Sequence, residues 1–295
     1  MPRAALLSIH ARVEGTEPST WEDPSLVQLW GPRFHAYTVA APDVAVFTLG
    51  TYPDDAKGQR KAEDLAARLR DLIGDERVAH QDAGRGLGIH PNQLRYAAAT
   101  GTVLIRWDGA RQPTVWTVPP SGVDPRDARL ELASRYLHTF GPATPESFAG
   151  WVGIGARHGQ AAFDALAESL TLVRTPLGAA WILAVDEPTV RGVPPSPARA
   201  RLLPSGDAYF LLHGADRELL VPKADQRAAL WTSRVWPGAL LVEGEIAGTW
   251  RRGNEIVTIQ TWRPLSPTAR DAVEAEAAAL PLPGLHRPIV VRWDP

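Results

Sequence analysis

The side chains of this sequence that suggest chemistry are arginines, amides and histidines, and the chemistry is contact with phosphates and bases. The sequence has no cysteine, which excludes thiolate metal sites, disulfides and cysteine nucleophiles. The eight histidines are scattered, and no set of His, Asp and Glu has metal-ligand spacing. No Gly-x-Ser-x-Gly motif occurs, and the glycines of 84–90 follow no predicted strand, as a nucleotide-binding loop would. We therefore expect no metal and no other cofactor.

The candidate contacts lie where predicted helices begin and predicted hairpins turn. One group opens a predicted helix over 90–100, a second opens a helix over 157–170, and others lie at a hairpin tip and on a predicted β-turn at 251–252. Arginine suits such sites because its planar fork matches phosphate and base edges, although a solvated surface side chain is the alternative at each position. The set is Asn92, Gln93, Arg95, Arg111, Arg157, His158, Arg251 and Arg252.

The stretch 126–186 contains the elements that would position one of these groups. An amphipathic helix is predicted to end at Gly141-Pro142. Thr144 before Pro145 marks the start of a short helix, which should end at Gly153. A helix over 157–170 and a β-hairpin over 172–185 complete the order typical of a winged helix-turn-helix.

The same order occurs once more, earlier in the chain. Helices are predicted over 60–73 and 90–100, followed by a hairpin of 102–107 and 114–118. We predict an α+β fold of tandem winged helix-turn-helix units with a β-rich C-terminal domain. The predicted divisions are 1–52, a remnant of a first unit, then 53–120, 121–190 and 198–295.

The last division is predicted from short apolar runs separated by turn residues. Strands are expected at 208–212, 219–221, 239–242, 245–251, 255–262 and 288–293, with one helix over 267–280. The proline-rich stretch 186–204 before it is predicted to be a linker. The region 74–88, which is polar and rich in glycine, has no predicted element.

The overall composition indicates a globular, cytoplasmic monomer. The 295 residues can form two or three domains, and no run of about 18 apolar residues could cross a membrane. The N-terminus is a poor signal peptide. A net charge of −2 argues against tight nonspecific DNA binding, but it permits binding through a local basic face.

Other polar residues have plainer interpretations. His10, His35 and His138 are expected to pack or to cap. An internal salt bridge is expected of Asp207 and of Asp216-Arg217, with catalysis as the lesser alternative. Most tryptophans should lie in the core.

Several phrases occur together, in order, over nearly the whole chain: GPATPESFAGWVGI, LLPSGDAYFLLHGADRELLVP, WPGALLVEGEIAGTWRR and PLSPTARDAVEAEAAAL. This order resembles the winged-helix family that contains the interstrand-crosslink-repair DNA glycosylases, the AlkZ/YcaQ-like group. The resemblance implies tandem winged helices that bind DNA, and excision of alkylated or crosslinked purines without a metal.

Two motifs of that family differ here. The family carries Gln-x-Gln or Gln-x-Asp just before a phrase resembling residues 2–8; this sequence has no Gln-x-Gln. The family also often has Arg-Gly-Thr-x-His, of which only Arg33 matches, because Phe34, His35 and Tyr37 replace the other three. The resemblance adds Arg33 to the candidate DNA contacts and leaves the catalytic residues unknown.

Two explanations of the missing pair are open. The start could be misplaced, with the glutamines encoded upstream of Met1, or the protein could bind DNA without the chemistry. We expect a partner of double-stranded DNA, damaged or intact, and no membrane. The function predicted first is a glycosylase-like DNA-binding protein, inactive in excision as given. The alternatives are a non-catalytic regulator or lesion sensor, and a scaffold for protein contacts.

Overall fold

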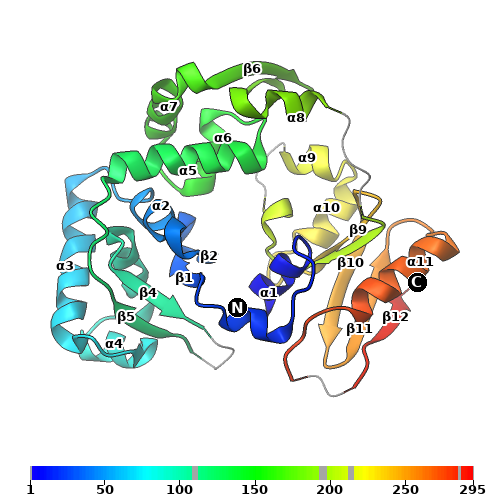
Figure 1. Cartoon of the computed structure of the whole chain (residues 1–295), viewed down its shortest axis with the longest axis horizontal. Coiled ribbons are helices and arrows are strands. Elements are labelled where there is room, and N and C mark those ends of the chain that lie inside the picture. The colour runs from blue at the N-terminus through cyan, green and yellow to red at the C-terminus, as the bar shows by residue number, and fades with distance from the viewer. Residues whose placement is uncertain (1, 108–111, 193–197, 212–215, 285–286, 295) are drawn as a thin grey trace. The chain divides into compact units, whose positions relative to one another are not determined.

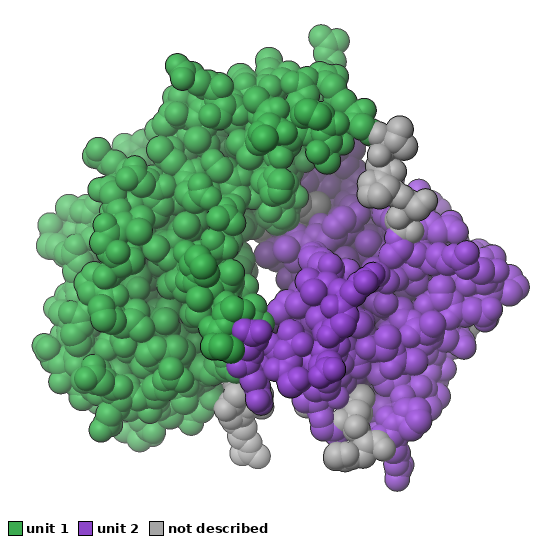
Figure 2. Space-filling model, in the orientation of Figure 1, with its two compact units in different colours: residues 1, 24–193 green, residues 2–23, 194–295 purple. Residues whose placement is uncertain are grey.

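The computed structural model describes residues 2–107, 112–192, 198–211, 216–284 and 287–294 (Figure 1). The chain divides into two compact units (Figure 2). Unit 1 comprises residues 24–193 and Met1, and unit 2 combines 2–23 with 194–295. The fold is mixed α+β, as predicted. Among the described helices, none is long and apolar enough to span a bilayer.

Unit 1 begins with a hairpin and continues with helices that pack on a small sheet. The sheet has the strand order β3-β5-β4, and β1 pairs with β2 in antiparallel register. The elements in order are β1 (Leu26–Trp30), η2 (Pro32–Phe34), β2 (Ala36–Ala40), η3 (Ala41–Asp43), α2 (Val44–Leu49), α3 (Ala56–Ile73), β3 (Val78–Ala79), α4 (His80–Gly86), η4 (Pro91–Thr100), β4 (Val103–Arg106) and β5 (Thr114–Thr117).

Local sequence explains the long helix α3. The Asp55 carboxylate accepts a hydrogen bond from the Gly58 N–H at 2.8 Å, which caps the first turn. Leu65, Leu69 and Ile73 form the buried face, which packs with η4 and the β4–β5 hairpin. The predicted helices 60–73 and 90–100 are both present, although 91–100 is a 3₁₀ helix. The glycine-rich stretch 74–88 forms β3 and α4, which sequence reasoning did not predict.

The remainder of unit 1 repeats the order of helix, short helix, helix and hairpin. The elements are α5 (Pro125–Phe140), α6 (Pro145–Val152), α7 (Ala156–Ala165), η5 (Ala167–Ser169), β6 (Leu170–Thr175), β7 (Gly178–Leu183), η6 (Ala184–Asp186) and α8 (Glu187–Arg191). Thr144 caps α6 through the Ser147 N–H, and Gly153 ends it with φ 88°, as predicted. Phe148, Trp151 and Phe163 fill the core of this part.

Unit 2 is built on a five-stranded sheet in the order β12-β11-β10-β9-β8, in which only β11 and β12 run parallel. The strands are β8 (Ala200–Leu203), β9 (Gly238–Val242), β10 (Glu245–Gly253), β11 (Ile256–Thr261) and β12 (Val290–Asp294). The helices are α1 (Pro2–His10), η1 (Pro18–Glu22), η7 (Ala208–Phe210), α9 (Asp216–Leu220), α10 (Ala224–Leu230) and α11 (Pro267–Ala278). Leu7 of α1 joins the core between this sheet and α11.

Three predictions about this region were wrong. The expected strand 208–212 begins with η7, because the Asp207 carboxylate accepts a hydrogen bond from the Tyr209 N–H and turns the backbone. The expected strand 219–221 falls on the end of α9, whose first turn carries two acids. The expected linker 186–204 contains α8 and β8, since the apolar side chains of Leu202 and Leu203 are buried beside β9.

Candidate nucleic-acid interface

The turn between β1 and β2 has an unusual backbone. Arg33 and Phe34 are consecutive non-glycine residues in the left-handed region, with φ of 55° and 57°. Each such residue costs about 1–2 kcal/mol relative to right-handed backbone. The turn is closed by hydrogen bonds from Phe34 N–H to Gly31 C=O at 2.9 Å and from Gly31 N–H to His35 C=O at 2.9 Å. The surrounding contacts therefore hold a conformation that the residues themselves disfavour.

Arg33 links this turn to the end of α6. Its Nη1 donates to the Gly150 carbonyl at 2.9 Å. At Gly153, an added Cβ would lie 3.2 Å from the Arg33 Cγ, so glycine there permits the close approach. A cation is favoured at this end of a helix, where backbone carbonyls point outward. Arg33 thus lies against the turn that leads into α7, on which Arg157 and His158 are found.

Phe34 and its neighbours form a group of cations and aromatic rings, here called the Arg95 cluster: Arg33, Phe34, Lys61, Arg95 and Tyr96. The Phe34 and Tyr96 rings meet edge to face, with centroids 4.9 Å apart and planes at 77°. The Arg95 guanidinium carbon lies 5.6 Å from the Phe34 centroid and 5.3 Å from the Tyr96 centroid. Lys61 Nζ lies 3.8 Å from the Tyr96 centroid. These are cation–π distances, so the rings position the cations.

The electrostatics of the cluster are those of a positive surface. A hydrogen bond from Arg95 and the charges of Arg95 and Lys61 lower the pKa of Tyr96. Burial lowers the pKa of His35, and the charges of Arg33 and Arg95 lower it further. The His35 residue as a whole is exposed, so its ring is only partly enclosed by protein. Among the described residues, no carboxylate pairs with Arg33, Lys61 or Arg95. Such cations are available to an anionic ligand.

Asn92 and Gln93 lie at the start of η4, the 3₁₀ helix that carries Arg95. Both are exposed, and the His90 ring caps this end of η4 by accepting from the Asn92 N–H at 3.2 Å. An open hollow of about 450 Å³ lies beside them, lined in part by His80, His90 and Asn92. The structure thus brings Arg33, Asn92, Gln93 and Arg95 to one turn and one 3₁₀ helix.

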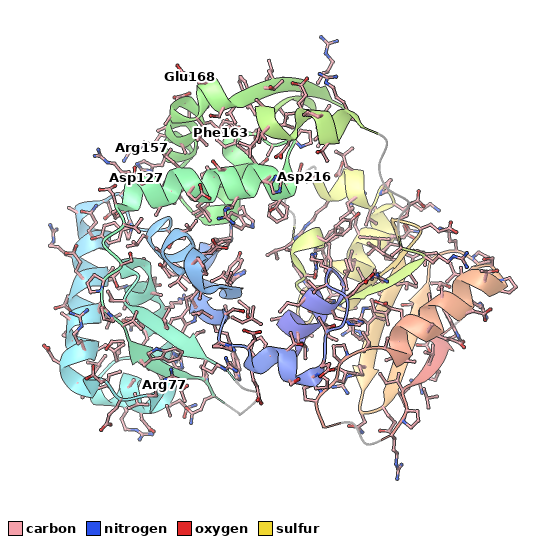
Figure 3. All side chains as sticks on the ribbon, in the orientation of Figure 1. Arg77, Asp127, Arg157, Phe163, Glu168 and Asp216 are labelled. Atoms are coloured by element: carbon pink, nitrogen blue, oxygen red, sulfur yellow. The ribbon has the colours of Figure 1, made fainter. Side chains whose placement is uncertain are left out.

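Arg157 and His158 belong to a second network in unit 1. Arg157 Nε donates to His158 Nε2 at 3.2 Å, and His158 Nδ1 lies 3.1 Å from an Asp54 carboxylate oxygen. Although this distance is short, His158 Nδ1 has no hydrogen-bond partner among the described residues. Asp54 also pairs with Arg129 at 2.5 Å. Figure 3 shows the Arg157 side chain extending away from α7, where it is exposed.

The remaining candidates are placed elsewhere. Arg251 and Arg252 were predicted on a β-turn, which was wrong; they lie near the end of β10, in unit 2. This strand continues to Gly253 because its residues pair with β11 up to Ile256. Arg251 donates to the Val235 carbonyl at 3.1 Å, and Arg252 donates to the Asn254 carbonyl at 2.5 Å. Arg111 lies outside the described residues.

The structure gives contacts for three of the polar residues that had plainer interpretations. Asp207, whose side chain is fully buried, forms a salt bridge with Arg12 at 2.7 Å, as expected. His10 Nδ1 lies 2.6 Å from the Thr16 hydroxyl, and His138 Nδ1 lies 2.9 Å from Asp186. Within the described part of the chain, no group of three or more His, Asp and Glu residues could hold a metal ion.

Comparison with known proteins identifies the family. A family model described as DNA glycosylase AlkZ-like matches residues 1–281 of the 295. The chain belongs to the AlkZ-like DNA glycosylase family. This confirms the resemblance inferred from the sequence phrases. Among solved structures, the DNA glycosylase AlkZ of Streptomyces sahachiroi is similar, with a TM-score of 0.78 and 16% identity over 99% of this chain and 89% of that chain. At this identity the likeness is one of fold. No curated protein sequence matches significantly.

Sequence reasoning missed three members of the Arg95 cluster in this AlkZ-like chain: Phe34, Lys61 and Tyr96. Phe34 was noted only as a departure from the family motif. Tyr96 directly follows Arg95, so an aromatic beside a candidate cation was a usable signal. Lys61 lies on α3, far from Tyr96 in sequence, and only the packing of α3 against η4 brings the two together.

Proposed function

We infer that this chain binds duplex DNA through unit 1, with the Arg95 cluster as a principal phosphate contact. The observation that supports this proposal is that Arg33, Lys61 and Arg95 are held by aromatic rings and a backbone carbonyl and not by carboxylates, within the described residues. DNA affinity depends on cations that can neutralise phosphates, and a cation already paired with a carboxylate gains less from a phosphate. The family match supports the same ligand.

The tandem winged-helix architecture is part of this proposal. Residues 53–120 and 121–190 would each form one winged-helix unit, and 198–295 the β-rich domain. Of the predicted remnant 1–52, residues 2–23 belong to unit 2, so 24–52 would be the part that stays with the winged-helix units. In this arrangement η4 and α7 are the recognition helices, and Arg95 and Arg157 would contact the backbone. Arg33, a member of the Arg95 cluster whose side chain contacts Gly150 and lies beside Gly153, would join the two.

A salt titration tests DNA binding directly. We expect the 295-residue chain to bind a 20-base-pair duplex with an affinity that falls steeply as salt rises, because each neutralised phosphate contributes a slope of about −0.9 in log K against log salt. An absence of salt-dependent binding would reject this proposal and favour a scaffold that contacts proteins only.

A second candidate is a DNA-binding regulator or lesion sensor without base excision. The observation that favours it is the absence of Gln-x-Gln from the sequence. Cationic alkylated purines leave readily, but an enzyme must still hold water against the electron-poor sugar, and neutral glutamines are suited to that task. In this proposal the chain recognises damaged DNA and leaves the base in place.

Base release tests this second candidate against an active glycosylase. Duplex containing 7-methylguanine is incubated with the 295-residue chain, and free base is measured by chromatography. We expect release at the spontaneous rate, even at protein concentrations that saturate the duplex. Release well above that rate would make the chain an active glycosylase and would require catalytic residues other than the missing glutamine pair.

A further inference from the structure

Phe34 is the least expected residue of the Arg95 cluster, because glycine would suit its backbone better. A phenylalanine with φ 57° is strained by its Cβ, whereas glycine adopts this conformation without that cost. Phe34 is only partly buried, so packing in the core does not fully explain why an aromatic side chain occurs at this position. Strained residues of this kind are typical of sites that present a side chain to a ligand.

The turn that carries Phe34 is closed by hydrogen bonds and lies close to cations. Its hydrogen bonds close the loop at both ends, and Arg33 anchors it to Gly150. Tyr96 supports one edge of the Phe34 ring at 4.9 Å. Arg95 and Lys61 lie over the two rings or beside them, at distances of 3.8 to 5.6 Å. A fixed aromatic surface surrounded by unneutralised cations has the composition of a site for single-stranded nucleic acid.

We propose that the Phe34 ring, supported by Tyr96, forms a stacking platform for an unpaired nucleobase of DNA. Arg33, Lys61 and Arg95 bind the phosphates on either side of that nucleotide. In an intact duplex each base face is covered by its neighbours, so the platform acts on a nucleotide that has left the stack, at a bulge or a damaged pair. This inference rests on the proposed DNA binding, and it adds to it the structure of the DNA that is preferred.

The test compares two DNA ligands and four proteins. The ligands are a fully paired duplex and the same duplex with one extrahelical adenine, both labelled with fluorescein and measured by anisotropy at one salt concentration. The proteins are the full 295-residue chain, Phe34→Leu, Tyr96→Leu and the control Tyr209→Leu. Leucine keeps apolar volume and removes the ring face, and Tyr209 is a partly exposed aromatic of unit 2. Equal melting temperatures establish that the variants are folded.

We expect the unmodified chain to prefer the bulged duplex by about 5-fold or more, the contribution of one stacked base. In Phe34→Leu and Tyr96→Leu the ratio of the two affinities should fall to about 1, since stacking contributes only to the unpaired ligand. A loss of cation positioning would instead weaken binding of both ligands alike and leave that ratio unchanged. Tyr209→Leu should retain the preference.

Each other result has a definite meaning. Equal binding of both ligands by the unmodified chain overturns the platform and leaves the proposed DNA binding intact. A preference that survives in Phe34→Leu and Tyr96→Leu overturns the assignment to these two rings. Binding of neither ligand overturns both proposals.

Discussion

The ring of Phe34 meets the ring of Tyr96 edge to face, 4.9 Å apart, although the two lie on different elements of unit 1. Phe34 belongs to the turn after β1, and Tyr96 lies in η4 beside Arg95. This contact joins the only candidate taken from the family motif, Arg33, to a candidate found from helix pattern alone, Arg95. Arg33 and Arg95 thus lie on one surface of unit 1.

Backbone strain at Phe34 predicts that glycine is a more stable substitution there than alanine, the reverse of the usual order. At ordinary positions glycine destabilises a protein more than alanine does. At φ 57° alanine keeps the Cβ clash and glycine removes it, so Phe34→Gly should be more stable than Phe34→Ala by about 1 kcal/mol. Urea denaturation of the two variants measures the difference. A lower stability for the glycine variant would show that the backbone there is not strained.

The salt bridge between Arg12 and Asp207 predicts a loss of stability in unit 2. Asp207 is fully buried, and it also accepts from the Ser8 hydroxyl at 2.6 Å, so Arg12→Ala leaves a buried carboxylate without its cation. We expect a loss of about 2 kcal/mol, as for a buried charged group deprived of one partner. Arg12→Ala combined with Asp207→Asn should lose less than the sum of the two single changes. Additive losses, measured by thermal unfolding, would show that the pair does not interact.

His158 is expected to act through Arg157. Because His158 Nε2 accepts from Arg157 Nε, the ring holds the guanidinium in one orientation. His158→Ala should therefore weaken DNA binding by about 2- to 5-fold, the effect of one hydrogen bond. The double variant with Arg157→Ala should bind no more weakly than Arg157→Ala alone. If the fold losses of the two single variants multiply in the double variant, as measured by anisotropy titration, His158 does not act by positioning Arg157.

The pKa of His35 predicts a pH dependence of both stability and binding. Its pKa in the folded chain lies below the ordinary histidine value of about 6.5, so the folded state favours the neutral ring. The contribution of His35 to stability is therefore complete above pH 6.5 and is lost as pH falls through the folded pKa. DNA phosphates beside Arg33 and Arg95 should raise that pKa, so binding takes up a proton.

Affinity for DNA should then rise between pH 7.5 and 5.5 in the unmodified chain, and His35→Gln should flatten the profile. Other histidines near DNA would contribute to both proteins, so the difference between the two profiles isolates His35. Parallel profiles of affinity against pH in the two proteins would show that DNA binding does not change the pKa of His35.

Much of the helical framework could be predicted from local signals. Thr144 and Pro145 marked the start of α6, and Gly153 marked its end, because capping depends on residues adjacent in sequence. The apolar residues Tyr209 and Phe210 were wrongly predicted to form a strand. Asp207 sets the conformation there, and its side chain is held by Arg12, which lies 195 residues earlier in the chain. No local pattern reports a pairing over that distance.

The candidate site shows the same limit. Arg33 and Arg95 were found from motif and helix pattern, but their neighbours were not. The left-handed backbone at Phe34 could not be predicted, because the usual sequence signal for that conformation is a glycine and this position is a phenylalanine. Lys61 contacts Tyr96 only because α3 packs on η4. Residues brought together by packing cannot be identified from spacing alone.

Neutralising the three cations of the Arg95 cluster tests the central claim most directly. The test protein carries Arg33→Gln, Lys61→Gln and Arg95→Gln, and the control carries Arg68→Gln, Arg85→Gln and Arg191→Gln. The control loses the same charge from unit 1, at arginines that are paired with carboxylates. Both are titrated with duplex DNA across a range of salt. The slope of log K against log salt should become shallower by about 2 to 3 in the test protein, one phosphate contact for each cation, and change little in the control. Equal slopes in the two proteins would contradict the claim that these cations bind DNA.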